Sequence, residues 1–320
     1  MFKIPLMDII LMILGFILLV IGGEYLVRAS VGLSLKLNLS KMVIGLTVVS
    51  FATSLPELLV SLNAALQGVP AIAINNVVGS NIANIGLVLG ITAICTTVEV
   101  DQSFYKFNWP SLVIFSLLLY FFLKTDNQLS SVEGWVLFSA LSLFIYLLIK
   151  KSRTSLQELD SSIELSDKVS YFKILIWLVI GALALFFGAD WLVDGAVVVA
   201  HKMGVSEAVI SVSLIAVGTS IPELAASIIA LIKNEKAISL GNLIGSNIFN
   251  IGSVLGLTSI IKSIPVDDSQ ILSRDILWML VFAVIILPLV VLKKRNKLQF
   301  KEGFFLVLLY SVFIVLVFRS

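Results

Sequence analysis

Long apolar runs separated by short polar segments make up most of the sequence. A helix needs about 20 apolar residues to cross the hydrocarbon core of a bilayer. This pattern therefore predicts an all-α, polytopic membrane protein. Ten membrane-spanning helices are expected, at residues 6–28, 40–67, 71–95, 107–124, 131–150, 171–200, 206–232, 237–262, 272–292 and 302–319.

The longest polar interruption lies in the middle of the chain. Residues 151–170 have mixed charge and several serines, a composition typical of a solvent-exposed linker. It divides the chain into a first five-helix unit at 1–150, a cytoplasmic linker at 151–170 and a second five-helix unit at 171–320.

The two units repeat each other at an offset of 166 residues, the distance between Glu57 and Glu223 (223 − 57 = 166). Aligning residues 15–90 with 181–256 gives 30 identities in 76 positions, which indicates a duplicated unit. The fourth and fifth spans do not align convincingly with the ninth and tenth. Because each unit has an odd number of spans, the second must enter the membrane from the opposite side, and the repeats are inverted. With both termini outside, 16 Lys and Arg residues lie in cytoplasmic loops and six lie outside, as the positive-inside rule favours.

An acid and a proline occur together in the second span and again in the seventh, within Ser50–Leu58 and Ala216–Leu224. An ionisable residue in a membrane span is costly and usually functional. In the first copy Thr53 and Glu57 are four residues apart and share a helix face. Pro56 lacks an N–H and should leave the Ala52 carbonyl oxygen without its helical partner, and the kink should also loosen neighbouring carbonyls such as that of Ser50. The second copy repeats the arrangement with Ala216, Thr219, Ser220, Pro222 and Glu223.

The span after each of these motifs carries a second polar cluster, which reads Gly-Ser-Asn-Ile-x-Asn-Ile-Gly. Ser80 and Asn84 are four residues apart in the first copy, and Ser246 and Asn250 in the second. The glycines allow a broken helix and close helix approach. Both motifs therefore place hydroxyl and amide oxygens on single helix faces.

Composition limits the chemistry of these motifs. The chain is 59% hydrophobic and 13% charged with a mean hydropathy of +1.08, and its net charge of +2 gives no support for nucleic-acid binding. One cysteine, Cys95, excludes an internal disulfide, and one histidine, His201, argues against a zinc site. The remaining donors are oxygens, which Ca²⁺ and Na⁺ prefer. Two carboxylates in one dry site repel each other when charged, so protons compete with cations there.

The motifs Thr-Ser-x-Pro-Glu and Gly-Ser-Asn-Ile-x-Asn-Ile-Gly, each present twice in inverted halves, resemble those of the Ca²⁺/cation antiporter superfamily, above all the prokaryotic sodium/calcium exchangers. The resemblance covers essentially the whole chain. It implies four central cation sites between the second, third, seventh and eighth spans, with the first and sixth spans sliding as a gate. The ligands it implies are Ser50, Thr53, Ser54, Glu57, Ser80, Asn84, Ala216, Thr219, Ser220, Glu223, Ser246 and Asn250, with Ser50 and Ala216 acting through their carbonyl oxygens.

One departure concerns Asn250, because archaeal exchangers of this type often have Asp at that position. Because Asn250 carries no charge, the affinity of the site for ions and the part that protons play in transport are left open. We expect a Ca²⁺/Na⁺ antiporter of the cell membrane that works by alternating access, needs no cofactor and is complete as a monomer in the lipid bilayer. The alternatives are a Ca²⁺/H⁺ antiporter on the same fold, a cation channel, and an intramembrane hydrolase using Ser54 or Ser220, which lacks a histidine base in the membrane.

Overall fold

The protein is helical throughout its long elements in the computed structural model, which describes residues 6–100, 102–157, 169–202, 218–266, 268–291 and 296–319. Its long helices follow the order predicted from the apolar runs, whereas its short strands were not predicted. In chain order, the helices and strands are α1 (Leu6–Leu37), α2 (Lys41–Ile44), η1 (Gly45–Val49), α3 (Ser50–Thr53), α4 (Leu55–Leu66), α5 (Ala71–Ala83), η2 (Asn84–Leu89), α6 (Gly90–Cys95), β1 (Val98–Glu99), η3 (Phe104–Asn108), α7 (Trp109–Asp126), β2 (Gln128–Leu129), α8 (Ser131–Gln157), α9 (Tyr171–Lys202), α12 (Ile221–Ile232), α13 (Lys236–Phe249), η5 (Asn250–Leu255), α14 (Gly256–Ile261), β3 (Ile264–Pro265), η6 (Ile271–Asp275), α15 (Ile276–Val291), β4 (Lys297–Leu298) and α16 (Phe300–Arg319).

Within the described residues, eight helices are long and apolar enough to cross a membrane. A ninth candidate is the bent pair Lys41–Thr53 and Leu55–Leu66, whose two parts meet at 43°. The predicted seventh span is described only in part: its apolar helix α12 is shorter, and residues 203–217 lie outside the described ranges. The helices otherwise begin and end close to the predicted limits.

The largest difference from the predicted limits is at the first helix. α1 continues to Leu37, nine residues beyond the predicted end at residue 28 (37 − 28 = 9). The predicted span ended at the charged residue Arg28. In the structure the Arg28 guanidinium pairs with Glu24 one turn earlier, and the helix continues past this pair. α8 likewise continues to Gln157, into the predicted linker.

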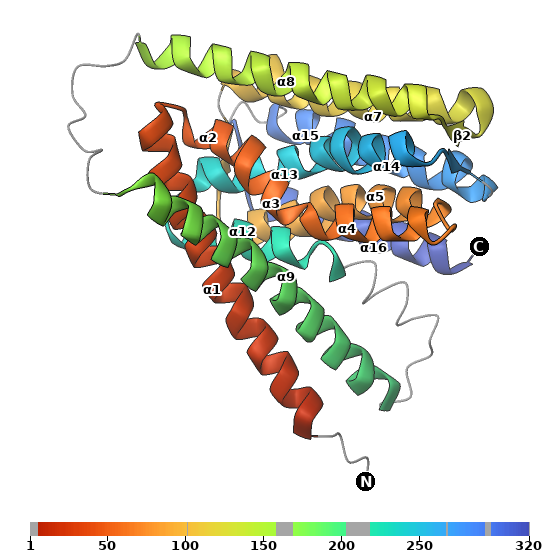
Figure 1. Ribbon diagram of the computed structural model, residues 1–320, viewed down its shortest axis with the longest axis horizontal. Helices are drawn as coiled ribbons and strands as arrows, with labels where there is room; N and C mark the ends of the chain where they lie inside the picture. Colours follow the sequence, from red (N-terminus) through yellow and green to blue (C-terminus); the bar gives the residue numbers. More distant parts are fainter. Residues whose placement is uncertain are drawn as a thin grey trace.

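Two helices are inclined to the rest and pack closely against each other. α1 and α9 run side by side, inclined to most of the other long helices, which are roughly parallel (Figure 1). The two helices are antiparallel and contact each other closely at glycines: a Cβ on Gly15 would lie 2.7 Å from the Gly188 carbonyl oxygen, and one on Gly22 would lie 2.9 Å from that of Gly181. These four glycines are the pairs related by the 166-residue offset. Their bare backbones therefore allow two equivalent helices to pack at very short range.

The remaining helices form a bundle around two buried spans. Most residues of Ala71–Cys95 and Lys236–Ile261 are enclosed by protein, whereas the other candidate spans are mostly exposed on their outer faces. Two short antiparallel ladders tie the loops at the bundle ends, one pairing β1 with β4 and one pairing β2 with β3. The two spans that carry the Gly-Ser-Asn-Ile-x-Asn-Ile-Gly motif are thus the most completely buried of the spans compared.

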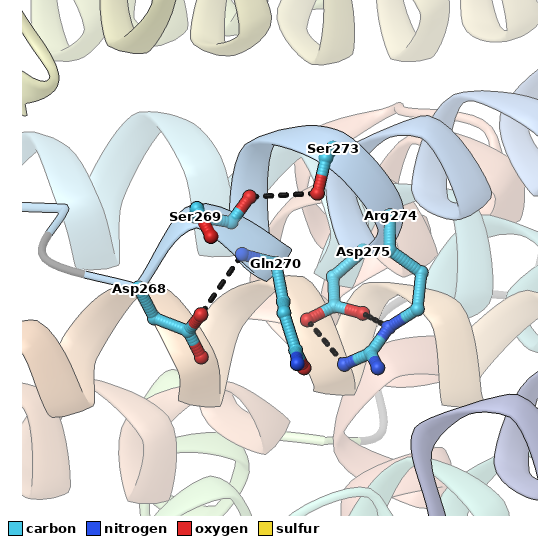
Figure 2. A network of polar contacts seen from close by, with 6 residues as sticks. All are labelled: Asp268, Ser269, Gln270, Ser273, Arg274 and Asp275. Carbon is cyan, nitrogen blue, oxygen red and sulfur yellow. Dashed lines mark hydrogen bonds and ion pairs between the residues drawn. The ribbon is translucent and has the colours of Figure 1, made fainter. Parts of the chain in front are cut away.

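The segment around η6, just before α15, shows how charges are placed at a bundle end (Figure 2). Asp268 Oδ1 accepts a hydrogen bond from the backbone N–H of Gln270 at 2.8 Å, which caps the helical segment. Arg274 then pairs with its neighbour Asp275, with Nε to Oδ1 at 2.6 Å. Because the two charges cancel, the segment can keep them next to its apolar run.

Candidate functional site

The helix break predicted at each proline is present in both motifs. Ser54 has φ −85° and ψ 4°, and Ser220 has φ −89° and ψ 0°, so both leave the helical region at equivalent places. Pro56 and Pro222 follow in the first turn of α4 and α12, where a missing N–H is tolerated. The break therefore starts a new helix in the middle of the protein.

Each new helix presents its acid at its amino-terminal end. Glu57 and Glu223 lie in the first turns of α4 and α12, where the helix dipole favours negative charge. Both side chains are completely buried, and none of their four carboxylate oxygens has a hydrogen-bond partner. The two carboxylates are close enough to repel each other when both are charged. Buried carboxylates that are charged and have no hydrogen-bond partner require a compensating positive group.

The second motif supplies two wide helical turns. π-helical turns begin at Asn84 and at Asn250, and they end at Leu89 and Leu255. Turns of this type are uncommon and frequently occur at functional sites. α4 packs against the turn that begins at Asn250, and α12 packs against the turn that begins at Asn84, so each acid faces the amide motif of the other half.

Hydroxyl groups connect the two halves in reciprocal pairs. Thr53 Oγ1 lies 3.1 Å from Ser246 Oγ, and Ser80 Oγ lies 3.0 Å from Thr219 Oγ1. The first pair lies next to the Glu223 carboxylate, but its hydroxyls bond to each other and to Asn242 Oδ1 rather than to that carboxylate. The reciprocity follows from the 166-residue offset, which relates each member of one pair to a member of the other.

Two asparagines outside the predicted ligand set support the broken helices. Asn76 Nδ2 donates to the Glu57 carbonyl oxygen at 3.3 Å and to Ser61 Oγ at 3.1 Å. Asn242 Nδ2 donates to Ser227 Oγ at 3.2 Å and, more weakly, to the Glu223 carbonyl oxygen at 3.5 Å. The signal was available, because all these positions are identical in the two repeats. They hold the first turn of each acid-bearing helix.

The expectation for the Ser50 carbonyl is wrong in one respect. Its oxygen is not released by the kink, since it accepts the Ser54 N–H at 2.9 Å as in an ordinary helix. The break begins one residue too late to free it. The Ser50 hydroxyl donates to the Gly45 and Asn242 carbonyl oxygens, which joins the second span to α13. Ala216, its counterpart, lies outside the described residues.

The structure brings the other ten predicted residues into one buried region formed by α3, α4, α5, α12, α13 and the wide turns η2 and η5. Four of them are the paired hydroxyl residues, and the other six have buried side-chain oxygens without a hydrogen-bond partner. These six are Ser54, Glu57, Asn84, Ser220, Glu223 and Asn250. In the part of the chain that the structure describes, no group of three or more His, Cys, Asp and Glu residues is placed to hold a metal. The region is an all-oxygen cluster with two acids, suited to hard cations.

Comparison with known proteins agrees with this chemistry. The chain matches the sodium/calcium exchanger protein family over residues 7–150 and 173–319. It belongs to that family. A solved structure of the sodium/calcium exchanger from Methanococcus jannaschii matches with a TM-score of 0.80 at 30% identity, covering 96% of this chain and 97% of that one.

Two curated relatives are similar over nearly their whole length. The membrane protein MJ0091 of Methanocaldococcus jannaschii is 33% identical over 301 residues, which cover 94% of each chain. The sodium/calcium exchanger MaX1 of Methanosarcina acetivorans is 27% identical in an alignment 349 residues long, which covers 97% of this chain and 98% of that one. The protein is therefore a polytopic membrane antiporter of the Ca²⁺/cation superfamily.

Proposed function

We propose that the protein exchanges Ca²⁺ for Na⁺ at the buried oxygen cluster by alternating access. The observation that carries the proposal is the set of unpartnered oxygens on Glu57, Glu223 and the four neutral residues beside them. Two carboxylates neutralise one Ca²⁺, and the hydroxyl and amide oxygens complete a shell of the type that Ca²⁺ prefers. The same oxygens suit Na⁺, so the ions compete for one set of ligands.

Sodium is favoured as the counter-ion over the proton. In the cluster only the two glutamates can take up a proton, because the neighbouring Asn84 and Asn250 are amides. His201 is exposed in the last turn of α9 and offers no proton path within the cluster. Several neutral oxygens remain, which serve Na⁺ and have no use in proton transport. In a cell, such an exchanger uses the inward flow of Na⁺ down its gradient to extrude Ca²⁺.

We further propose ten spans arranged as two inverted repeats, at 1–150 and 171–320, with both termini outside the cell membrane. Reciprocal contacts support this arrangement throughout. The β1–β4 and β2–β3 ladders exchange equivalent strands between the halves. Gly134 of α8 packs against Gly256, just as Gly303 of α16 packs against Gly90, which extends the relation to the fifth and tenth spans. One chain supplies every ligand, so a monomer suffices.

Reconstituted protein tests the proposal directly. Liposomes are loaded with Na⁺ or buffered to an acidic interior, diluted into ⁴⁵Ca²⁺ at clamped voltage, and followed for uptake. We expect uptake driven by the outward Na⁺ gradient alone. Uptake with an outward proton gradient and no Na⁺ would replace sodium by the proton, and uptake without either gradient would indicate a channel.

A further inference from the structure

A buried amide outside the predicted ligand set is connected to one of those ligands. Asn81 is 1% exposed in α5, and its Oδ1 accepts a hydrogen bond from Asn250 Nδ2 at 3.1 Å. Its own Nδ2 donates to the backbone carbonyl oxygen of Asn247 at 3.2 Å and faces the Met279 sulfur at 3.8 Å. The hydrogen bonds therefore run in one direction: Asn250 donates to Asn81, and Asn81 donates to the backbone of α13.

The direction of these hydrogen bonds is fixed by their last acceptor. The carbonyl oxygen of Asn247 can only accept, so Asn81 must turn its NH₂ group towards it. The Asn81 oxygen then faces Asn250, which must present its own NH₂ group in return. As a result the Asn250 oxygen points the other way, and it is one of the buried oxygens without a partner. A cation needs that oxygen, because the NH₂ group would repel it.

The equivalent connection in the other half is not made. The offset of 166 residues relates Asn81 to Asn247 and Asn250 to Asn84. However, Asn247 Nδ2 donates within its own helix, to Leu243 O at 2.7 Å, and its Oδ1 has no partner. Neither side-chain atom of Asn84 has a partner. The two amides therefore differ: a hydrogen bond fixes the orientation of Asn250, and none fixes that of Asn84.

We infer that Asn81 is a positioning residue, which aims the Asn250 oxygen at the transported cation. The inference rests on the proposed cation exchange and adds a residue to it that does not touch the ion. Without Asn81 the Asn250 amide would lose its anchor and could present either end. Second-shell partners of metal ligands contribute about 10- to 100-fold in affinity. We therefore expect Asn81→Ala to raise the KM for Ca²⁺ about tenfold while the maximal rate per folded protein is retained.

Asn247→Ala is the matched control. It removes an equally buried amide from the equivalent position, but it keeps the backbone carbonyl on which Asn81 is anchored. We expect its KM for Ca²⁺ to stay within about twofold of the unaltered protein, since no second-shell partner of a ligand is lost. Asn81→Ser serves as a second variant, because its short hydroxyl can bond to its own helix and preserve insertion while still failing to reach Asn250.

The measurement is ⁴⁵Ca²⁺ uptake against Ca²⁺ concentration in proteoliposomes with equal amounts of inserted protein. A raised KM in both Asn81 variants and an unchanged KM in Asn247→Ala would support the inference. A lowered maximal rate with an unchanged KM would show that Asn81 is merely structural, and equal KM shifts at both asparagines would also overturn the positioning role. If the unaltered protein takes up no Ca²⁺ under any gradient, the exchange itself fails, which this design reveals separately.

Discussion

Replacing Glu223 with Gln should nearly abolish Ca²⁺ transport. The carboxylate is fully buried, accepts no hydrogen bond and lies beside Glu57, so its charge has no role in holding the described structure together. Gln keeps the volume of the side chain but leaves Ca²⁺ with one carboxylate instead of two. Removing one partner from a buried charge pair is worth about 3–5 kcal/mol. At 1.4 kcal/mol for each tenfold change, Ca²⁺ affinity should fall by roughly two to three and a half orders of magnitude.

The assay is Na⁺-driven ⁴⁵Ca²⁺ uptake at a Ca²⁺ concentration near the KM of the unaltered protein. Glu302→Gln provides a control, since Glu302 is also a buried acid in a candidate span, but it caps α16 by accepting the Gln299 N–H at 3.0 Å. Gln performs this capping role as well, so the control should transport normally. Uptake by Glu223→Gln within a few-fold of the control would refute the two-carboxylate site.

Two further predictions follow from the same geometry. A Cβ on Gly245 would overlap the Ser50 hydroxyl oxygen and lie 2.8 Å from Leu46 Cα. Gly245→Ala should therefore destabilise the protein by about 1–3 kcal/mol, measured as a lower Tm in detergent. An unchanged Tm would contradict this packing. Ca²⁺ at 100 times its Kd should stabilise the protein by about 2.7 kcal/mol, an effect that a chelator reverses, and an equal effect in Glu223→Gln would locate the bound ion elsewhere.

Much of the fold follows from local sequence, because membrane spans depend on the apolar length of a segment. The limits of most helices were predicted to within a few residues for this reason. The weaker repeat in the last two spans of each half has a simple cause in the structure. The wide turns at Phe104–Asn108 and Ile271–Asp275 are related by 167 residues, and the packing glycines Gly134 and Gly303 are related by 169. A gapless alignment at 166 cannot detect this relation.

The residues of the site could be predicted from the sequence, but the hydrogen bonds between them could not. Residue types and spacing identified the acids and the hydroxyls, since a carboxylate inside a membrane span is costly and rarely occurs without a functional role. Which hydroxyl pairs with which depends on how the halves interlock, and this is set by tertiary packing. The Ser50 carbonyl illustrates the limit: a proline predicts a break nearby, but whether the break begins at residue 53 or 54 decides which carbonyl is released.

The proposed alternating access requires that the site be exposed without being dismantled, and the placement of α1 and α9 beside the bundle fits this requirement. All eleven candidate ligands that the structure describes lie on the bundle, and the hydroxyl pairs Thr53–Ser246 and Ser80–Thr219 join its halves. α1 and α9 contribute none of these ligands, and their most extensive contact is with each other. We infer that they move as one unit across a fixed bundle. Closely packed glycines favour movement as a pair, because the bare backbone surfaces hold α1 and α9 together at short range.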